Sequence, residues 1–206
     1  MDDMILNNIS RFTSLTTDEK RFFESVLELR MIPKKTIIHH EGDICQFEGF
    51  IKKGCARVYY MDQSGCEVTL SFAIEDCWIT DICSFYEKSI SDFTIETLED
   101  TEMYVFTLET KEKLFAKIPK LERSFRLLVQ RNLSVFQNRL VNMILKSATE
   151  RYLEFIKMYP SVPARVPQYY IASYLGVSPA FISTIRKRLC GNKYIILLNT
   201  LIMNIL

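Results

Sequence analysis

The repeat of apolar residues changes along this chain, and the change constrains the fold more than any other feature. Between Thr36 and Leu108, short runs of alternating apolar and polar residues are separated by the turn sequences EGD and QSG. Gly42, Gly54 and Gly65 fall about 8–12 residues apart, a spacing typical of antiparallel sandwiches and barrels. After Leu108 the helical repeat returns. The pattern predicts an α+β protein with an N-terminal antiparallel β-roll.

The sequence of the N-terminal part predicts one helix and the inward-facing residues of the strands. Residues 16–30, TTDEKRFFESVLELR, predict a helix that Thr17 caps and Pro33 ends. Six alternating residues are predicted to point inward: Phe50, Val58, Tyr60, Val68, Leu70 and Phe72. His39 and His40 are adjacent on a strand and face opposite sides, so we predict no metal site and no cofactor.

Residues 119–146 predict one long helix with Pro119 in its first turn. Two apolar stripes follow it, and one contact surface needs only one stripe. They are Leu121, Phe125, Leu128, Asn132 and Val135, and Val129, Leu133, Phe136, Leu140 and Met143. We expect one stripe to face the roll and the other to face the same helix of a second subunit in a homodimer. The predicted dimerisation residues are Phe125, Leu128, Asn132 and Val135; a single broad core face is the alternative.

A helix–turn–helix pattern lies near the C-terminus, in QYYIASYLGVSPAFISTIRKRL. Gly176 suits the turn, Ser178 is a candidate N-cap and Pro179 fits the first helical position. Seven apolar residues have the spacing that packs the two helices together: Ile171, Ala172, Leu175, Val177, Ile182, Ile185 and Leu189. Ala180, Thr184, Lys187 and Arg188 share another face, which is slim at one end and basic at the other. A helix that enters the major groove has this profile.

The distribution of charge also separates the C-terminal part from the rest of the chain. Residues 1–146 hold 19 Lys and Arg against 23 Asp and Glu, whereas residues 147–206 hold 7 against 2. A basic C-terminal part that follows an acidic N-terminal part indicates that the C-terminal part meets a polyanion. There is no apolar run of about 20 residues and no basic n-region, so we expect a cytoplasmic protein without a membrane partner. The six Cys residues are scattered and are expected to be small buried apolar residues.

The order of these parts resembles the Crp/Fnr family of bacterial transcription regulators over nearly all of residues 15–193. The segments IASYLGVSP and FISTIRKRL carry the resemblance in the C-terminal motif, and EGD, FIKKGCARVYY and SATERYLEFI carry it elsewhere. The resemblance implies an eight-stranded, cyclic-nucleotide-binding-like roll, a long dimerisation helix and a winged-helix-like DNA-binding domain. It divides the chain into a sensor domain (1–118), the dimerisation helix (119–146) and the DNA-binding domain (147–206). The implied partners are double-stranded DNA, a second copy of the chain, an unidentified small-molecule effector and, as a further candidate, RNA polymerase.

The chain departs from the family in its nucleotide pocket. Members that bind cyclic nucleotides hold the phosphate with a Gly-Glu pair and an Arg-Ser pair, and the corresponding stretch here is CWITDICSFYEKSISDF. Thr80 and Asp81 stand near the first pair, and Ile90 or Ser91 stands where the Arg belongs. Acidic residues dominate this region, and a buried phosphate needs a counter-charge or several N–H donors. We therefore expect no response to cAMP. Trp78, Thr80, Asp81 and Ser84 are candidates to line a pocket for another effector.

The second departure lies in the predicted DNA-binding helix. Many relatives place an acidic residue and an Arg or Lys where this chain has Ala180 and Thr184. Neither residue can form the bidentate contact that Arg makes to guanine, whereas Ala, Thr and Phe181 can touch a thymine methyl group. We expect reduced guanine readout and a preference for A·T-rich sites. The phosphates would be contacted by Arg186, Lys187, Arg188 and the backbone near Gln168.

Several alternatives remain open at this stage. The apolar tail YIILLNTLIMNIL would be a β-hairpin wing, pack on the DNA-binding domain or pair with a second chain. The chain carries no phosphate-cradling glycine loop and no nucleophile motif, so we predict that it is not an enzyme. The alternatives to a regulator are a small-molecule-binding roll with a weakened DNA-binding head, and a cupin-like enzyme with metal ligands inside the roll.

Overall fold

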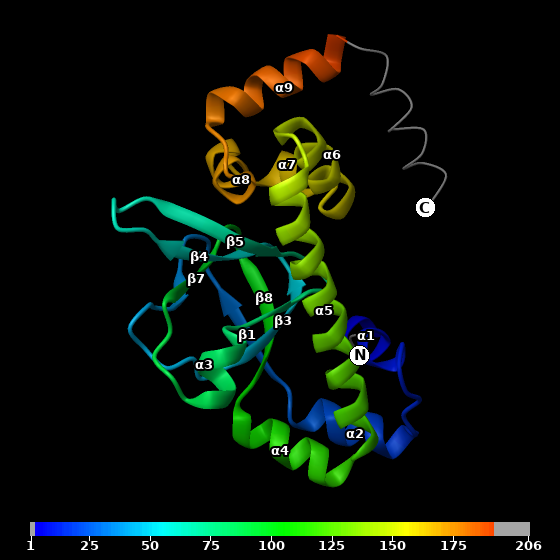
Figure 1. Ribbon diagram of the computed structural model, residues 1–206. Coiled ribbons are helices and arrows are strands. Elements are labelled where there is room, and N and C mark those ends of the chain that lie inside the picture. Colours follow the sequence, from blue (N-terminus) through cyan, green and yellow to red (C-terminus); the bar gives the residue numbers. More distant parts are fainter. Residues whose placement is uncertain (1–2, 192–206) are drawn as a thin grey trace. The chain divides into compact units, whose positions relative to one another are not determined.

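The computed structural model describes residues 3–191 (Figure 1). Its internal contacts divide the chain into two compact units, Met1–Arg139 and Leu140–Leu206. The division predicted from sequence differs in setting residues 119–146 apart, and it stays a prediction. The apolar tail lies outside the described residues, and so does the predicted wing. No helix in the described part is long and apolar enough to cross a membrane.

Eight antiparallel strands form two four-stranded sheets in the first unit. One sheet has the order β1 (Glu28–Ile32), β8 (Thr101–Phe106), β3 (Glu48–Lys53) and β6 (Trp78–Ile79). The other has the order β2 (Ile37–His39), β7 (Phe93–Thr97), β4 (Ala56–Met61) and β5 (Glu67–Ala73). Between the sheets lies an apolar core that includes Ile51, Val58, Ile95 and Met103. The predicted β-roll is therefore confirmed.

A β-bulge interrupts the pairing of β5 with β4. The pairing of β4 with β5 shifts between Val58 and Tyr59, so that Leu70 has no partner of its own in the ladder. Val58 and Phe72 are buried as predicted, but Tyr60 is exposed, and the prediction for Tyr60 was wrong. On β5, the carbonyl oxygen of the extra residue Leu70 accepts a hydrogen bond from the Arg139 guanidinium.

Two short helices precede the roll, and they differ from the single helix that the sequence pattern predicted. Helix α2 (Thr17–Ser25) begins with a capping box in which Thr16, not Thr17, is the N-cap residue. It ends at Ser25, and residues 28–32 form strand β1, so the predicted helix over residues 16–30 was too long. Helix α1 (Asp3–Ser10) was not predicted, and its residues Ile5, Leu6 and Ile9 are buried.

A second apolar cluster joins these helices to the roll. It brings together residues of α1, α2, β3, β8, α4 (Leu108–Lys117) and the start of α5 (Lys120–Leu145). Trp78, the only tryptophan in the chain, packs edge-on against Phe125 of α5, with ring centroids 5.2 Å apart. The Trp78 indole N–H donates to Asn8 of α1. Aromatic packing thus fixes the first turns of the long helix against the roll.

The second unit is helical. After the end of α5 it contains α6 (Ala148–Met158), α7 (Val162–Arg165), α8 (Gln168–Leu175) and α9 (Pro179–Gly191). Ser147 and Glu150 form a capping box at the start of α6. The last four residues of the segment SVPAR form the single turn α7, with a proline in its first turn. Tyr174 of α8 packs against Phe155 of α6.

Candidate nucleic-acid interface and sensor loop

The turn between α8 and α9 has the predicted geometry. Gly176 ends α8 in the left-handed conformation, with φ 65° and ψ 41°. Ser178 Oγ accepts the backbone N–H of Phe181, and Pro179 occupies the first position of α9. These local signals fix where α8 ends and where α9 begins.

Two buried isoleucines set the rotation of α9 about its axis. Ile182 and Ile185 are almost fully buried, and of the packing residues on α8, Ile171, Ala172 and Leu175 are buried as well. Because residues of a helix advance by about 100° each, this inward face turns Ala180, Thr184 and Lys187 outward. All three are exposed. The two faces of α9 that the sequence predicted are therefore present in the structure.

Polar groups at the start of the outward face bond to one another. The Gln168 side-chain amide donates to the carbonyl oxygen of Pro179 at 2.7 Å and to Ser183 Oγ at 2.9 Å. The Thr184 hydroxyl donates to the carbonyl oxygen of Ala180 at 3.1 Å. Gln168 was predicted to lie near a phosphate contact, and in the structure it ties the two helices together. Ser183 was missed, because its role depends on a contact fifteen residues away.

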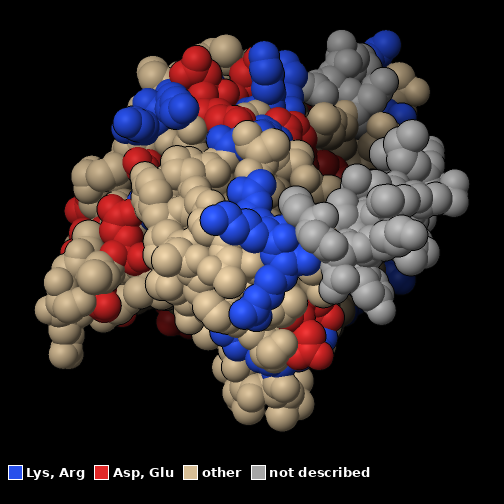
Figure 2. All heavy atoms as spheres, turned by 90° about the horizontal axis from the view of Figure 1, so that it is seen from above, with Lys and Arg blue, Asp and Glu red and all other residues tan. Residues whose placement is uncertain are grey.

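The far end of the outward face is basic. Arg186, Lys187 and Arg188 are exposed, and α9 contains no Asp or Glu. Figure 2 shows Lys and Arg side chains gathered in a row across a surface of largely uncharged residues. Phe181, beside Ala180, leaves 41% of its surface exposed. The predicted contact residues from Ser178 to Arg188 thus share one accessible helix and its cap.

The sensor loop follows β6 and contains the short helix α3 (Ile82–Glu87). The Asp81 carboxylate caps this helix by accepting the backbone N–H groups of Cys83 and Ser84. Its other oxygen accepts the Ser91 hydroxyl at 2.6 Å, and both residues are buried. The two positions that flank the loop are therefore bonded directly to each other. The Asp81–Ser91 bond was not predicted, because its two residues are ten positions apart in the chain.

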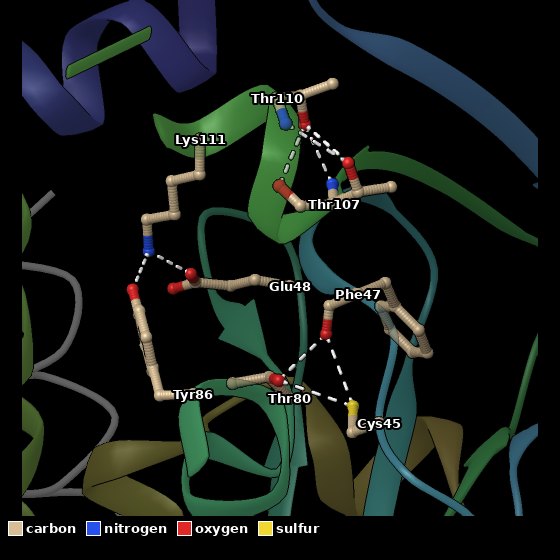
Figure 3. Close-up of polar contacts among 8 residues, drawn as sticks. All are labelled: Cys45, Phe47, Glu48, Thr80, Tyr86, Thr107, Thr110 and Lys111. Atoms are coloured by element: carbon tan, nitrogen blue, oxygen red, sulfur yellow. Dashed lines mark hydrogen bonds and ion pairs between the residues drawn. The ribbon is translucent and has the colours of Figure 1, made fainter. Parts of the chain in front are cut away.

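The other candidate pocket residues also have structural partners. Thr80 donates to the carbonyl oxygen of Phe47 at 2.8 Å and lies 3.6 Å from Cys45 Sγ (Figure 3). Buried Ser84 donates to the carbonyl oxygen of Ser89 at 2.7 Å. Trp78 belongs to the apolar cluster beside α5. Each of the four residues thus has a structural partner in a core, a helix cap or a loop contact, and their assignment to an effector pocket stays a prediction.

A buried cation lies on the other side of this loop. Lys111 of α4 pairs with Glu48 of β3, and its ammonium group is 2.5 Å from the Tyr86 hydroxyl of α3 (Figure 3). The ammonium also lies 4.2 Å from the centre of the Phe125 ring. Burial lowers the pKa of Lys111, although the Glu48 charge opposes this shift. Burial also raises the pKa of Tyr86, and the Glu48 charge adds to that rise. The sensor loop, the roll and α4 are thus in contact at the Lys111 ammonium group.

His39 is buried and His40 is exposed, which agrees with the predicted opposite faces. The Nε2 atom of His39 is buried without a hydrogen-bond partner. Burial lowers the pKa of His39, and the charge of Asp81 opposes the shift. In the described part of the chain, no three His, Cys, Asp or Glu residues are placed to hold a metal ion.

The cysteine prediction holds only in part. Cys45 and Cys55 are buried, whereas Cys66 and Cys83 are exposed. Cys66 lies in the turn between β4 and β5, and Cys83 lies in the first turn of α3, so neither has a core to enter. For these two cysteines the expectation of burial was wrong.

The two apolar stripes of α5 differ in how far their side chains are buried. Phe125 and Leu128 are buried within the first unit, and their assignment to dimerisation stays a prediction. Asn132 is exposed and Val135 half-buried; their role stays a prediction. The other stripe is open to solvent: Val129, Leu133, Phe136 and Leu140 expose 37%, 56%, 51% and 62% of their surfaces. The stripe left for a partner is therefore the second one.

Comparison with known proteins finds one matching family model and several solved structures with a similar fold. Residues 29–117 match the cyclic nucleotide-binding domain family. FixK2 from Bradyrhizobium japonicum superposes with a TM-score of 0.70 at 16% identity, over 80% of this chain and 85% of that one. No curated protein matches the sequence.

Two further solved structures share the architecture. The c-di-GMP responsive global regulator CLP of Xanthomonas campestris has a TM-score of 0.68 at 15% identity, over 85% of this chain and 92% of that one. The catabolite activator protein of Thermus thermophilus has a TM-score of 0.57 at 20% identity, over 89% and 87% of the two chains. The predicted resemblance is thus confirmed as a shared fold, and so is the predicted α+β class.

Proposed function

We propose that this chain, which has a cyclic nucleotide-binding domain at residues 29–117 and the fold of the Crp/Fnr regulators, is a DNA-binding transcription regulator that acts as a cytoplasmic homodimer. The observation that carries the proposal is the outward face of α9. A tight turn and two buried isoleucines present it to solvent, and it carries Lys187 and Arg188. Arg186 is exposed beside this face, and α9 contains no acid. A helix with this profile suits the major groove and its flanking phosphates.

The first test is a mobility-shift titration of the full chain on duplex DNA at several salt concentrations. If Arg186, Lys187 and Arg188 each neutralise one phosphate in both subunits, six counter-ions are released. The logarithm of the binding constant should then fall with the logarithm of salt with a slope of about −5. Replacing Lys187 by Ala removes one contact per subunit, so the slope should become shallower by about 2. A protein that binds no duplex at low salt would refute the proposal.

Dimerisation is proposed through the exposed stripe of α5. Isolated exposed apolar residues are ordinary, but a stripe at helical spacing indicates a partner surface. Leu133→Glu should convert the dimer to a monomer, because it places a charge in the middle of the stripe. Asn138→Glu is the matched control, since it adds the same charge on the opposite side of α5. Sedimentation velocity distinguishes the species, and a wild-type chain that is a monomer at micromolar concentration would contradict this part of the proposal.

We also propose that the sensor domain does not respond to cAMP. A phosphate bound at this loop would need donors, but the first N–H groups of α3 already bond to the Asp81 carboxylate. That carboxylate would also repel the phosphate, and Ser91 offers no positive charge to offset it. Calorimetry with cAMP and cGMP should give no binding heat at micromolar ligand. Micromolar binding of either nucleotide would refute this part and leave the proposed DNA binding standing.

A second function is favoured by one observation. The first turns of α9 have no charged side chain for base contacts, which would fit a small-molecule-binding roll whose DNA-binding head has weakened. Such a protein would bind all duplexes weakly and without preference. Selection from a random duplex library separates the two functions, because a working regulator enriches a near-palindromic sequence.

A further inference from the structure

The base-reading part of α9 is short of hydrogen-bond donors. The amide group of Gln168 gives its N–H bonds to Pro179 and Ser183, and the Thr184 hydroxyl donates to Ala180. Ser183 donates to the carbonyl oxygen of Pro179 at 3.3 Å. The side-chain donors of Gln168, Ser183 and Thr184 are therefore engaged within the protein.

Methyl groups and acceptors are what remains for a ligand. Since the Thr184 hydroxyl turns back onto the helix, its methyl group is the outward part of the side chain. Ala180 contributes a second methyl group one turn earlier, and Phe181 an exposed ring edge. Pro179 can only accept through its carbonyl oxygen, so the Gln168 nitrogen must face it. The Gln168 amide oxygen is thus left as an acceptor.

These methyl groups and the free acceptor favour some base pairs over others. The major-groove edge of guanine offers two acceptors, N7 and O6, and needs a pair of side-chain donors that Ala180, Phe181 and Thr184 do not offer. An A·T pair offers the thymine methyl group and the adenine amino group, which match an apolar surface and an acceptor. Cytosine also carries an amino group, but it has no methyl group for Ala180 and Thr184 to contact.

We infer that α9 reads sequence through thymine methyl groups, with Thr184, Ala180 and Phe181 as the specificity-determining residues. The inference rests on the proposed DNA binding and names the feature of DNA that is read. The cations at the far end of α9 then supply affinity without sequence preference.

The test replaces thymine by uracil. Duplexes are first selected with the full chain, and the winning sequence is synthesised with deoxyuridine at one thymine position at a time. Uracil keeps every hydrogen-bonding group of thymine and lacks only the methyl group. We expect each contacted thymine to lose about fourfold in affinity when replaced, which corresponds to burial of one methyl-sized group. Thymines outside the contacted positions should show no change.

Two variants tie the effect to Thr184. Thr184→Ser removes the methyl group and keeps the hydroxyl, so the thymine–uracil difference should shrink at one position. Thr184→Val keeps the methyl group and should preserve the difference. Lys187→Ala should weaken both duplexes equally. If the protein binds DNA but does not distinguish thymine from uracil, or selects guanine at the position that responds to residue 184, the inference fails and the proposed function stands. If it binds no duplex, both fail.

Discussion

Replacing Lys111 by Met should destabilise the first unit strongly, because the change leaves a carboxylate buried without its counter-ion. The side chains of Lys111 and Glu48 expose only 1% and 8% of their surfaces. Removing one partner of such a buried pair costs about 3–5 kcal/mol. With a urea dependence of about 2 kcal/mol per M, the unfolding midpoint should fall by about 1.5–2.5 M.

Trp78 makes the measurement specific to the first unit. It is the only tryptophan in the sequence and packs against Phe125, so its fluorescence reports the unfolding of this core. Lys113→Met is the matched control on the same helix. Lys113 pairs with Glu109, but these side chains expose 64% and 76% of their surfaces, and such a pair contributes about 0–1 kcal/mol.

A double variant tests the cause. Replacing Lys111 by Met and Glu48 by Leu removes both charges, so no buried carboxylate remains and most of the lost stability should return. Equal midpoints for the Lys111 and Lys113 variants would refute the reasoning. A double variant no more stable than the Lys111 single variant would refute it as well.

Three further changes probe other features. Asp81→Ala removes the cap of α3 and the acceptor of Ser91, and should cost about 2–3 kcal/mol in urea unfolding followed by Trp78 fluorescence, whereas exposed Asp92→Ala should have little effect. Gly176→Ala forces a side chain into the left-handed region and should cost about 1–2 kcal/mol of the second unit's stability, measured by circular dichroism; an unchanged midpoint would contradict the turn geometry. Burial lowers the pKa of His39 below the ordinary 6.5, so the unfolded chain binds the proton more readily. Stability should therefore be full above pH 6.5 and fall as the pH drops toward the folded pKa, and thermal unfolding of His39→Leu should lack that fall.

The features predicted well from sequence are those that depend on local chemistry. Gly176, Ser178 and Pro179 fix a turn through backbone conformation and capping, which neighbouring residues decide. The alternating pattern between Thr36 and Leu108 likewise reflects the two faces of each strand. Such signals lie within a few residues of one another, so the sequence shows them directly.

The features predicted poorly depend on contacts between distant residues. Whether Leu128 or Leu133 faces the roll is decided by the position of α5 on the apolar cluster, and both stripes have the same repeat. Tyr60 alternates with buried Val58 on β4, which pairs with β7 without a shift, yet it lies near the end of the strand and is exposed. Alternation along a strand does not encode how far the core extends. Asp81 looked like a pocket residue, but its bond to Ser91 becomes visible only when the loop closes.

The contact between Arg139 and the bulged residue Leu70 has a consequence for solubility. Strand β5 is at the end of its sheet, and a bare outer strand is a template on which other chains can stack into aggregates. The bulge interrupts the regular repeat of the ladder there, and the guanidinium takes the carbonyl oxygen of the bulged residue. Helix α5 and the bulged strand β5 together protect the roll from pairing with strands of other chains.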